Sequence, residues 1–155
     1  GSTVTTKLLS CRVIPAGNAL TEEFGLTPRS DITETVRLRS VDREAAALES
    51  SYIPVCIAPN LQTKPVTGSL YRLLEEEYGI HLIRGKQTMS VRAADAREAG
   101  ILNCSRGDAL AVMEMRAFDE NGVKVEYACS LTRGDRCRFT SILRMEEDYE
   151  AGSDW

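Results

Sequence analysis

Two arginines, Arg37 and Arg39, lie two positions apart in the stretch ETVRLRSVD, residues 34–42. In an extended strand, side chains two positions apart point to the same face, so these guanidinium groups share one face while Val36 and Leu38 share the other. A guanidinium group donates two parallel hydrogen bonds and therefore suits planar or tetrahedral oxyanions. The pair indicates either a solvated strand face or one side of a pocket for an anion.

Two glutamates are predicted to stand opposite arginines. If the chain turns at Glu44, Arg39 and Glu49 lie across from each other, and a turn at Asn121 places Arg116 opposite Glu126 in the same way. Such cross-strand pairs stabilise a sheet by roughly 0.2–1 kcal/mol and need no ligand. Both interpretations of the glutamates, structural partners or acceptors for hydroxyl and amine groups of a ligand, therefore remain open.

The segment GSLYRLLEEEYG, residues 68–79, predicts a helix that begins near Ser69 and ends at Gly79. Free backbone N–H groups and the positive end of the helix dipole make such a start suitable for phosphate or carboxylate, with the Thr67 hydroxyl nearby. Ser69 could equally serve as a helix cap alone. Together with two arginines, the helix start favours a small phosphorylated or carboxylated ligand.

The elements that must position these groups form a weak internal repeat. Residues 16–54 align with residues 93–131 at a constant shift of 77, and each half predicts a helix followed by a hairpin. Asn18 and Asp95 are the expected caps of the two helices. Under this shift Arg37 meets Glu114, so the double-arginine face exists in the first half alone. The pattern predicts an α+β fold, an antiparallel sheet with flanking helices and an internal pseudo-repeat.

Composition narrows the classes of function. The 155 residues carry a net charge of -4 without a long basic tract, so the chain by itself should bind nucleic acid poorly. Apolar runs are too short to span a bilayer and a secretory leader is missing, which predicts a cytoplasmic protein without membrane contact. Five cysteines without C-x-x-C and one histidine predict reduced thiols, no metal site and no cofactor. Gly1-Ser2 looks like an expression-vector remnant.

Several motifs in a fixed order resemble one family. The series VRLRSVD, Glu49, YIP, SLYRLLEEEYGI, DENGVKVEYACS and RGDRCRF resembles the UTRA domain of GntR-type transcription regulators of the HutC subfamily. The resemblance implies a chorismate lyase-like fold in a UTRA domain at residues 3–144, an acidic tail at 145–155, and an N-terminal winged helix-turn-helix that this chain lacks. It also implies effector-binding residues, namely Arg37, Arg39, Glu49, Ser69, Leu70, Tyr71 and Glu126, and Thr132 stands where the family pattern has tyrosine.

The same resemblance implies the function. It predicts a cytoplasmic homodimer, a repressor that binds a small anionic effector such as a sugar phosphate and contacts operator DNA only through the absent N-terminal domain. Urocanate-like carboxylates are an alternative effector. A chorismate lyase-like enzyme acting on a small carboxylated substrate is the rival class, although the order of motifs favours a regulator without catalysis. A domain used for dimerisation alone is the third possibility.

Overall fold

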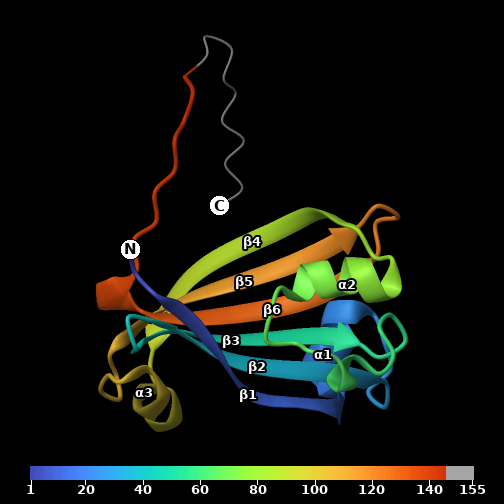
Figure 1. Cartoon of the computed structure of the whole chain (residues 1–155), viewed down its shortest axis with the longest axis horizontal. Coiled ribbons are helices and arrows are strands. Elements are labelled where there is room, and N and C mark those ends of the chain that lie inside the picture. The colour runs from blue at the N-terminus through green and yellow to red at the C-terminus, as the bar shows by residue number, and fades with distance from the viewer. Residues whose placement is uncertain (146–155) are drawn as a thin grey trace.

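Residues 1–145 are described by the structure, a computed structural model, and they form one antiparallel sheet of six strands with helices on both faces (Figure 1). The sheet order is β1-β2-β3-β6-β5-β4. The predicted α+β class with an antiparallel sheet is confirmed. In chain order the elements are β1 (Val4–Pro15), α1 (Gly17–Phe24), β2 (Asp31–Val41), β3 (Glu44–Pro54), the 3-10 turn η1 (Leu61–Thr63), α2 (Leu70–Tyr78), β4 (Leu82–Ala93), α3 (Ala96–Leu102), β5 (Ala109–Asp119), β6 (Lys124–Arg133) and the 3-10 turn η2 (Gly134–Arg136).

The predicted internal repeat is present at the level of elements. The series β1-α1-β2-β3 recurs as β4-α3-β5-β6, and the two copies meet along β3 and β6. The residue alignment at a shift of 77 is wrong, because it pairs Val36 of the buried core with Met113, which lines a cavity on the other face of the sheet. Side chains alternate along a strand, so an alignment that is off by one residue pairs side chains of opposite faces.

The first hairpin turns before Glu44, the predicted turn residue, and Glu44 is instead the first residue of β3. Asp42 and Arg43 both have positive φ, 51° and 70°, which is the conformation of a tight two-residue hairpin turn. A bulge then shifts the register next to Arg39, so that Arg39 pairs with Ala47. Arg37, and not Arg39, stands directly opposite Glu49.

The second hairpin also contains a bulge, which makes the predicted pairing of Arg116 with Glu126 wrong. Near the turn, Phe118 pairs with Lys124 as expected, but beyond the bulge Glu126 pairs with Ala117 and Arg116 pairs with Tyr127. One inserted residue thus places Arg116 and Glu126 on opposite faces of the sheet.

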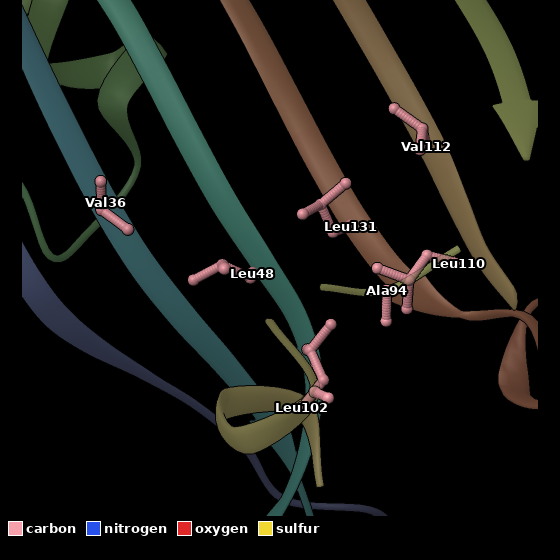
Figure 2. Close-up of a cluster of buried hydrophobic side chains, with 8 residues drawn as sticks. Val36, Leu48, Ala94, Leu102, Leu110, Val112 and Leu131 are labelled. Atoms are coloured by element: carbon pink, nitrogen blue, oxygen red, sulfur yellow. The ribbon is translucent and has the colours of Figure 1, made fainter. Parts of the chain in front are cut away.

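Each face of the sheet has its own buried cluster. On one face α3 packs on the central strands (Figure 2), and α1 joins this face through the ion pair between Glu23 and Arg116. On the other face α2 packs over Ile53 and Val125 through Leu70, Leu73 and Leu74. The first cluster consists of Val36, Leu48, Ala94, Ala99, Leu102, Leu110, Val112 and Leu131.

Helix ends follow the sequence except in α1. Ser69 caps α2 by accepting a hydrogen bond from the Arg72 backbone N–H, and Asp95 caps α3, as predicted. Gly79 ends α2 in the left-handed conformation. The prediction of Asn18 as a cap is wrong, because α1 begins at Gly17 and its N-cap residue is Ala16, two positions before Asn18.

The two edges of the sheet are β1 and β4. Residues 137–145, CRFTSILRM, have no regular secondary structure and extend away from the sheet (Figure 1). The predicted tail at 145–155 lies outside the described residues except for Met145.

Candidate ligand-binding pocket

A cavity of about 680 Å³ lies between the start of α2 and the central strands of the sheet. One of the eight predicted site residues, Thr132, does not line this cavity. It stands opposite Ala47, which in turn stands opposite Arg39 on the next strand. The fold brings the other seven predicted residues together from distant parts of the sequence. The predicted residues that do line the cavity are Arg37, Arg39, Glu49, Ser69, Leu70, Tyr71 and Glu126.

Arg37 is largely engaged by the protein itself. Its Nη1 donates to the carbonyl oxygens of Val66 and Gly68, at 3.2 and 2.9 Å, and its Nη2 lies 3.3 Å from Glu49 Oε2. The side chain is only 17% exposed. Arg37 thus holds the loop that leads into α2 against the sheet, and so fixes the position of the helix start.

Arg39 is far more open to the cavity. Its side chain is 49% exposed, and its contact with Glu49 Oε1 is 3.4 Å long. Glu49 therefore stands between the two arginines and accepts from both. Because an exposed ion pair of this length contributes little to stability, Arg39 can exchange it for a ligand at small cost.

Glu126 is a buried carboxyl group on the floor of the cavity. The residue is 3% exposed, and it accepts hydrogen bonds from Ser51 Oγ at 2.6 Å and from the Tyr71 hydroxyl at 2.8 Å. Burial raises the pKa of Glu126, although these hydrogen bonds and the charge of Arg37 act in the other direction. Burial, together with the Glu126 charge, also raises the pKa of Tyr71. Burial thus disfavours the charged form of Glu126, and the two hydroxyl donors partly offset that cost.

The start of α2 contributes backbone donors. The Ser69 hydroxyl takes up the N–H of Arg72 at 3.3 Å, so its capping role is confirmed. The N–H groups of Leu70 and Tyr71 belong to the first turn, which lacks intrahelical acceptors, and both residues line the cavity. Capping by Ser69 and an anion site at the same helix start are therefore compatible.

Comparison with known proteins decides the family. The model of the UTRA domain matches residues 1–138. The chain belongs to the UTRA domain family. The HTH-type transcriptional repressor NagR of Bacillus subtilis (strain 168) is 30% identical over 143 residues, which cover 92% of this chain and 59% of NagR. A protein described as the probable fructoselysine utilization operon transcriptional repressor of Escherichia coli (strain K12) is 28% identical over 120 residues, covering 77% and 49%.

Solved structures agree with this assignment. The C-terminal domain of Yurk from Bacillus subtilis superposes with a TM-score of 0.82 at 26% identity, covering 86% of this chain and 92% of that one. The effector domain of PhnF from Mycobacterium smegmatis gives a TM-score of 0.85 at 24% identity, covering 93% and 89%. These likenesses confirm the fold of a UTRA effector domain. The chain spans about half to three fifths of the length of the curated relatives it matches.

Arg116 lies outside the pocket of this UTRA domain. Its guanidinium group contacts Glu23 of α1, with Nε 2.5 Å from Oε1, and stacks 5.0 Å from the centre of the Tyr127 ring. Lys124 also reaches Glu23 at 3.1 Å. Burial acts to raise the pKa of Glu23, but hydrogen bonds from Arg116 and Lys124 outweigh it and lower the pKa. Arg116 therefore fastens α1 to the sheet, and Glu126 is left without an arginine partner from its own hairpin.

Sequence reasoning missed one side of the cavity. Gln87, Met113 and Met115 line it from β4 and β5. The spacing of Met113 and Met115, two positions apart, is the same signal that identified Arg37 and Arg39. It was overlooked because the alignment at a shift of 77 paired the methionines with apolar residues of the core.

Within residues 1–145, no group of three or more His, Cys, Asp or Glu side chains could hold a metal ion. A search of the helices in the same residues finds none that is long and apolar enough to cross a membrane.

Proposed function

We propose that this UTRA domain senses a small anionic effector, with a phosphorylated sugar as the leading candidate, and that it does so for a cytoplasmic GntR-type repressor of the HutC kind. The observation that carries the proposal is the half-exposed Arg39, whose guanidinium group shares one cavity with Arg37 and with the start of α2. Guanidinium groups and helix N-termini both favour oxyanions.

Polar groups around the arginines suit the rest of a sugar. Ser51 and Ser130 line the cavity between its two sides, and Glu49 and Glu126 offer carboxyl oxygens. Hydroxyl groups of a ligand can donate to such acceptors with good geometry. Among the relatives, one is named after fructoselysine utilization and another, 24% identical over 138 residues, after mannosyl-D-glycerate transport and metabolism. These names support a sugar derivative as the effector.

Signalling would proceed by a shift of population. The effector must bind one arrangement of the full-length regulator better than another, and only that difference in affinity can change operator binding. Arg37 is well placed for this role, since it ties the pocket to the loop before α2 through two carbonyl groups. DNA contact would come from a separate DNA-binding domain of the full-length regulator.

The full-length regulator is proposed to act as a homodimer. Two features of the described residues support an assembly: β4 is an exposed edge strand with Ile83 and Val91 turned to solvent, and residues 137–145 carry Phe139 and Ile142 without covering neighbours. Long apolar edges tend to pair with another chain. Sedimentation equilibrium at micromolar concentration should show a dimer, and Val91→Lys should shift it toward monomer. A monomer under all conditions would contradict this part of the proposal.

A thermal-shift screen tests the effector class directly. Sugar phosphates should raise the melting temperature of the wild-type chain, the matching free sugars should raise it much less, and Arg39→Ala should abolish the difference. Mass spectrometry of the purified protein would identify a copurified ligand. Stabilisation by free sugars alone would contradict an anionic effector. The rival enzyme predicts formation of 4-hydroxybenzoate from chorismate, and we expect none.

A further inference from the structure

Met113 and Met115 form a wall of the cavity that faces the two arginines. Across the sheet, Arg37 pairs with Glu49, Glu49 pairs with Ser130, and Ser130 pairs with Met113. One continuous row of side chains therefore runs from an arginine to a methionine. Three strand spacings of about 4.8 Å place the two ends of this row about 14 Å apart at the backbone.

The floor between these walls is low. On this face β3 and β6 present the short side chains of Ser51, Ala128 and Ser130, together with the carboxyl groups of Glu49 and Glu126. The long side chains on β2 and β5 and the short ones of Ser51, Ala128 and Ser130 between them make a trough. Its volume, about 680 Å³, is in the range of sites that enclose drug-sized molecules, so a phosphate group bound at Arg39 would occupy only one end.

The methionine wall is held in place from β4. Gln87 Nε2 donates to Met113 Sδ at 2.8 Å. Met115 Sδ lies where a side chain at Gly85 would stand, because a Cβ built there would be 2.8 Å away. Gly85 thus leaves room for the Met115 thioether against the strand.

Thioether groups are polarizable and apolar, and they adapt to the shape of what they contact. They cannot pair with a charge. Met113 and Met115 are half-buried, whereas Leu110 and Val112 of the same strand belong to the buried cluster on the other face. The two methionines therefore offer the cavity an apolar surface that the core does not use.

We propose that the effector has two chemically distinct ends, an anionic group held at Arg39 and an apolar substituent, such as an acyl, alkyl or aryl group, that packs on Met113 and Met115. The polar middle of the molecule lies over Ser51 and Ser130. The anionic end rests on the proposed function, while the methionine wall makes a separate claim about specificity.

A series of n-alkyl phosphates separates the two claims. Ethyl, butyl and hexyl phosphate carry the same anion, and each methylene that becomes buried should raise the affinity by up to about fourfold. Calorimetric titration of the wild-type chain should show affinity rising with chain length. In the double variant Met113→Gln and Met115→Gln the rise should be lost, so that hexyl phosphate binds no more tightly than ethyl phosphate. Met89→Gln, in the adjacent strand outside the cavity, is the matched control and should keep the full rise.

Each outcome decides one claim. Affinity that does not depend on chain length, or a rise that survives the double substitution, would overturn the methionine wall but leave the anion site standing. A rise that depends on the methionines and is unaffected by Arg39→Ala would support the wall and contradict the proposed anion site. Failure of every member of the series to bind would overturn both.

Discussion

The β2–β3 and β5–β6 hairpins are two copies of one motif that meet in the middle of the sheet and face the same cavity. Each contains a bulge, and each places two long side chains on the cavity face of its outer strand. In the first hairpin these are Arg37 and Arg39, and in the second they are Met113 and Met115. The backbone is repeated, whereas the chemistry at the cavity is not. The difference indicates that the repeat supplies the frame and a few facing positions supply recognition.

Replacement of Arg37 should lower the free energy of unfolding more than any replacement on the methionine side of the cavity. Arg37→Ala removes three hydrogen bonds, so that Glu49 and the carbonyl groups of Val66 and Gly68 lose the donor that Arg37 supplies. We expect the free energy of unfolding to fall by about 2 kcal/mol, measured by urea denaturation. Met115→Ala on the opposite wall should cost less than about 1 kcal/mol without ligand. Equal costs at the two positions would contradict the assignment of Arg37 as the residue that holds the loop.

The helices of the two halves differ as much as their hairpins. In α3, Asp95 and Glu98 cap each other's backbone, and Glu98 also pairs with both Nη groups of Arg92, at 2.7 and 2.6 Å. Glu98→Gln should destabilise the domain by about 1–2 kcal/mol. In α1, the exposed Asn18 is the matched control, and Asn18→Ala should change stability by less than about 0.5 kcal/mol.

The loss of stability in Glu98→Gln should depend on pH. Hydrogen bonds from Arg92 lower the pKa of Glu98 from 4.5 to about 2, against the effect of burial. A lowered pKa contributes stability that is fully present above pH 4.5 and disappears as the pH falls toward 2. The difference between wild type and Glu98→Gln should therefore shrink over this range in denaturation curves. A difference that is constant down to pH 2 would contradict the ion pair.

Replacement of Glu126 should raise the stability of the domain and weaken its affinity for the effector. Because burial raises its pKa above 4.5, the folded chain retains the Glu126 proton to higher pH than the unfolded chain, and stability falls as the pH rises through this window. Glu126→Gln removes that dependence; its carbonyl oxygen can accept from one of the Ser51 and Tyr71 hydroxyls and its amide N–H can donate to the other, so the melting temperature at neutral pH should rise. Affinity for a hydroxyl- or amine-bearing effector should fall by about tenfold or more. Lower stability with unchanged affinity would make Glu126 a structural residue.

Gly85→Ala should give the smallest change. The new Cβ must displace the Met115 sulfur, which is the mobile end of a flexible side chain, so stability should fall by less than about 1 kcal/mol. The displaced thioether narrows the trough, and hexyl phosphate should lose more affinity than ethyl phosphate in calorimetric titrations. Equal affinities of the variant and wild type for both compounds would show that Met115 does not bound the site.

Local signals in the sequence predicted much of this arrangement. The shared strand face of Arg37 and Arg39, the caps Ser69 and Asp95, and the end of α2 at Gly79 are all confirmed, because each depends on residues close together in the chain. The partners across the sheet were not predictable in the same way. One bulge residue in each hairpin changes the partners across the sheet: Arg37, and not Arg39, stands opposite Glu49, and Arg116 and Glu126 lie on opposite faces.

Titration of phosphorylated and free sugars is the most direct test of the anion site. We would measure, by calorimetry, a panel of hexose 6-phosphates and the corresponding free hexoses against wild type and Arg39→Ala. If Arg39 binds the anion, the tightest ligand should be a phosphate ester. Its affinity for Arg39→Ala should be about tenfold to hundredfold lower than for wild type, as expected for the loss of a charge-assisted hydrogen bond. A free hexose that binds as tightly as its phosphate, or a phosphate ester that binds Arg39→Ala as well as wild type, would contradict the account.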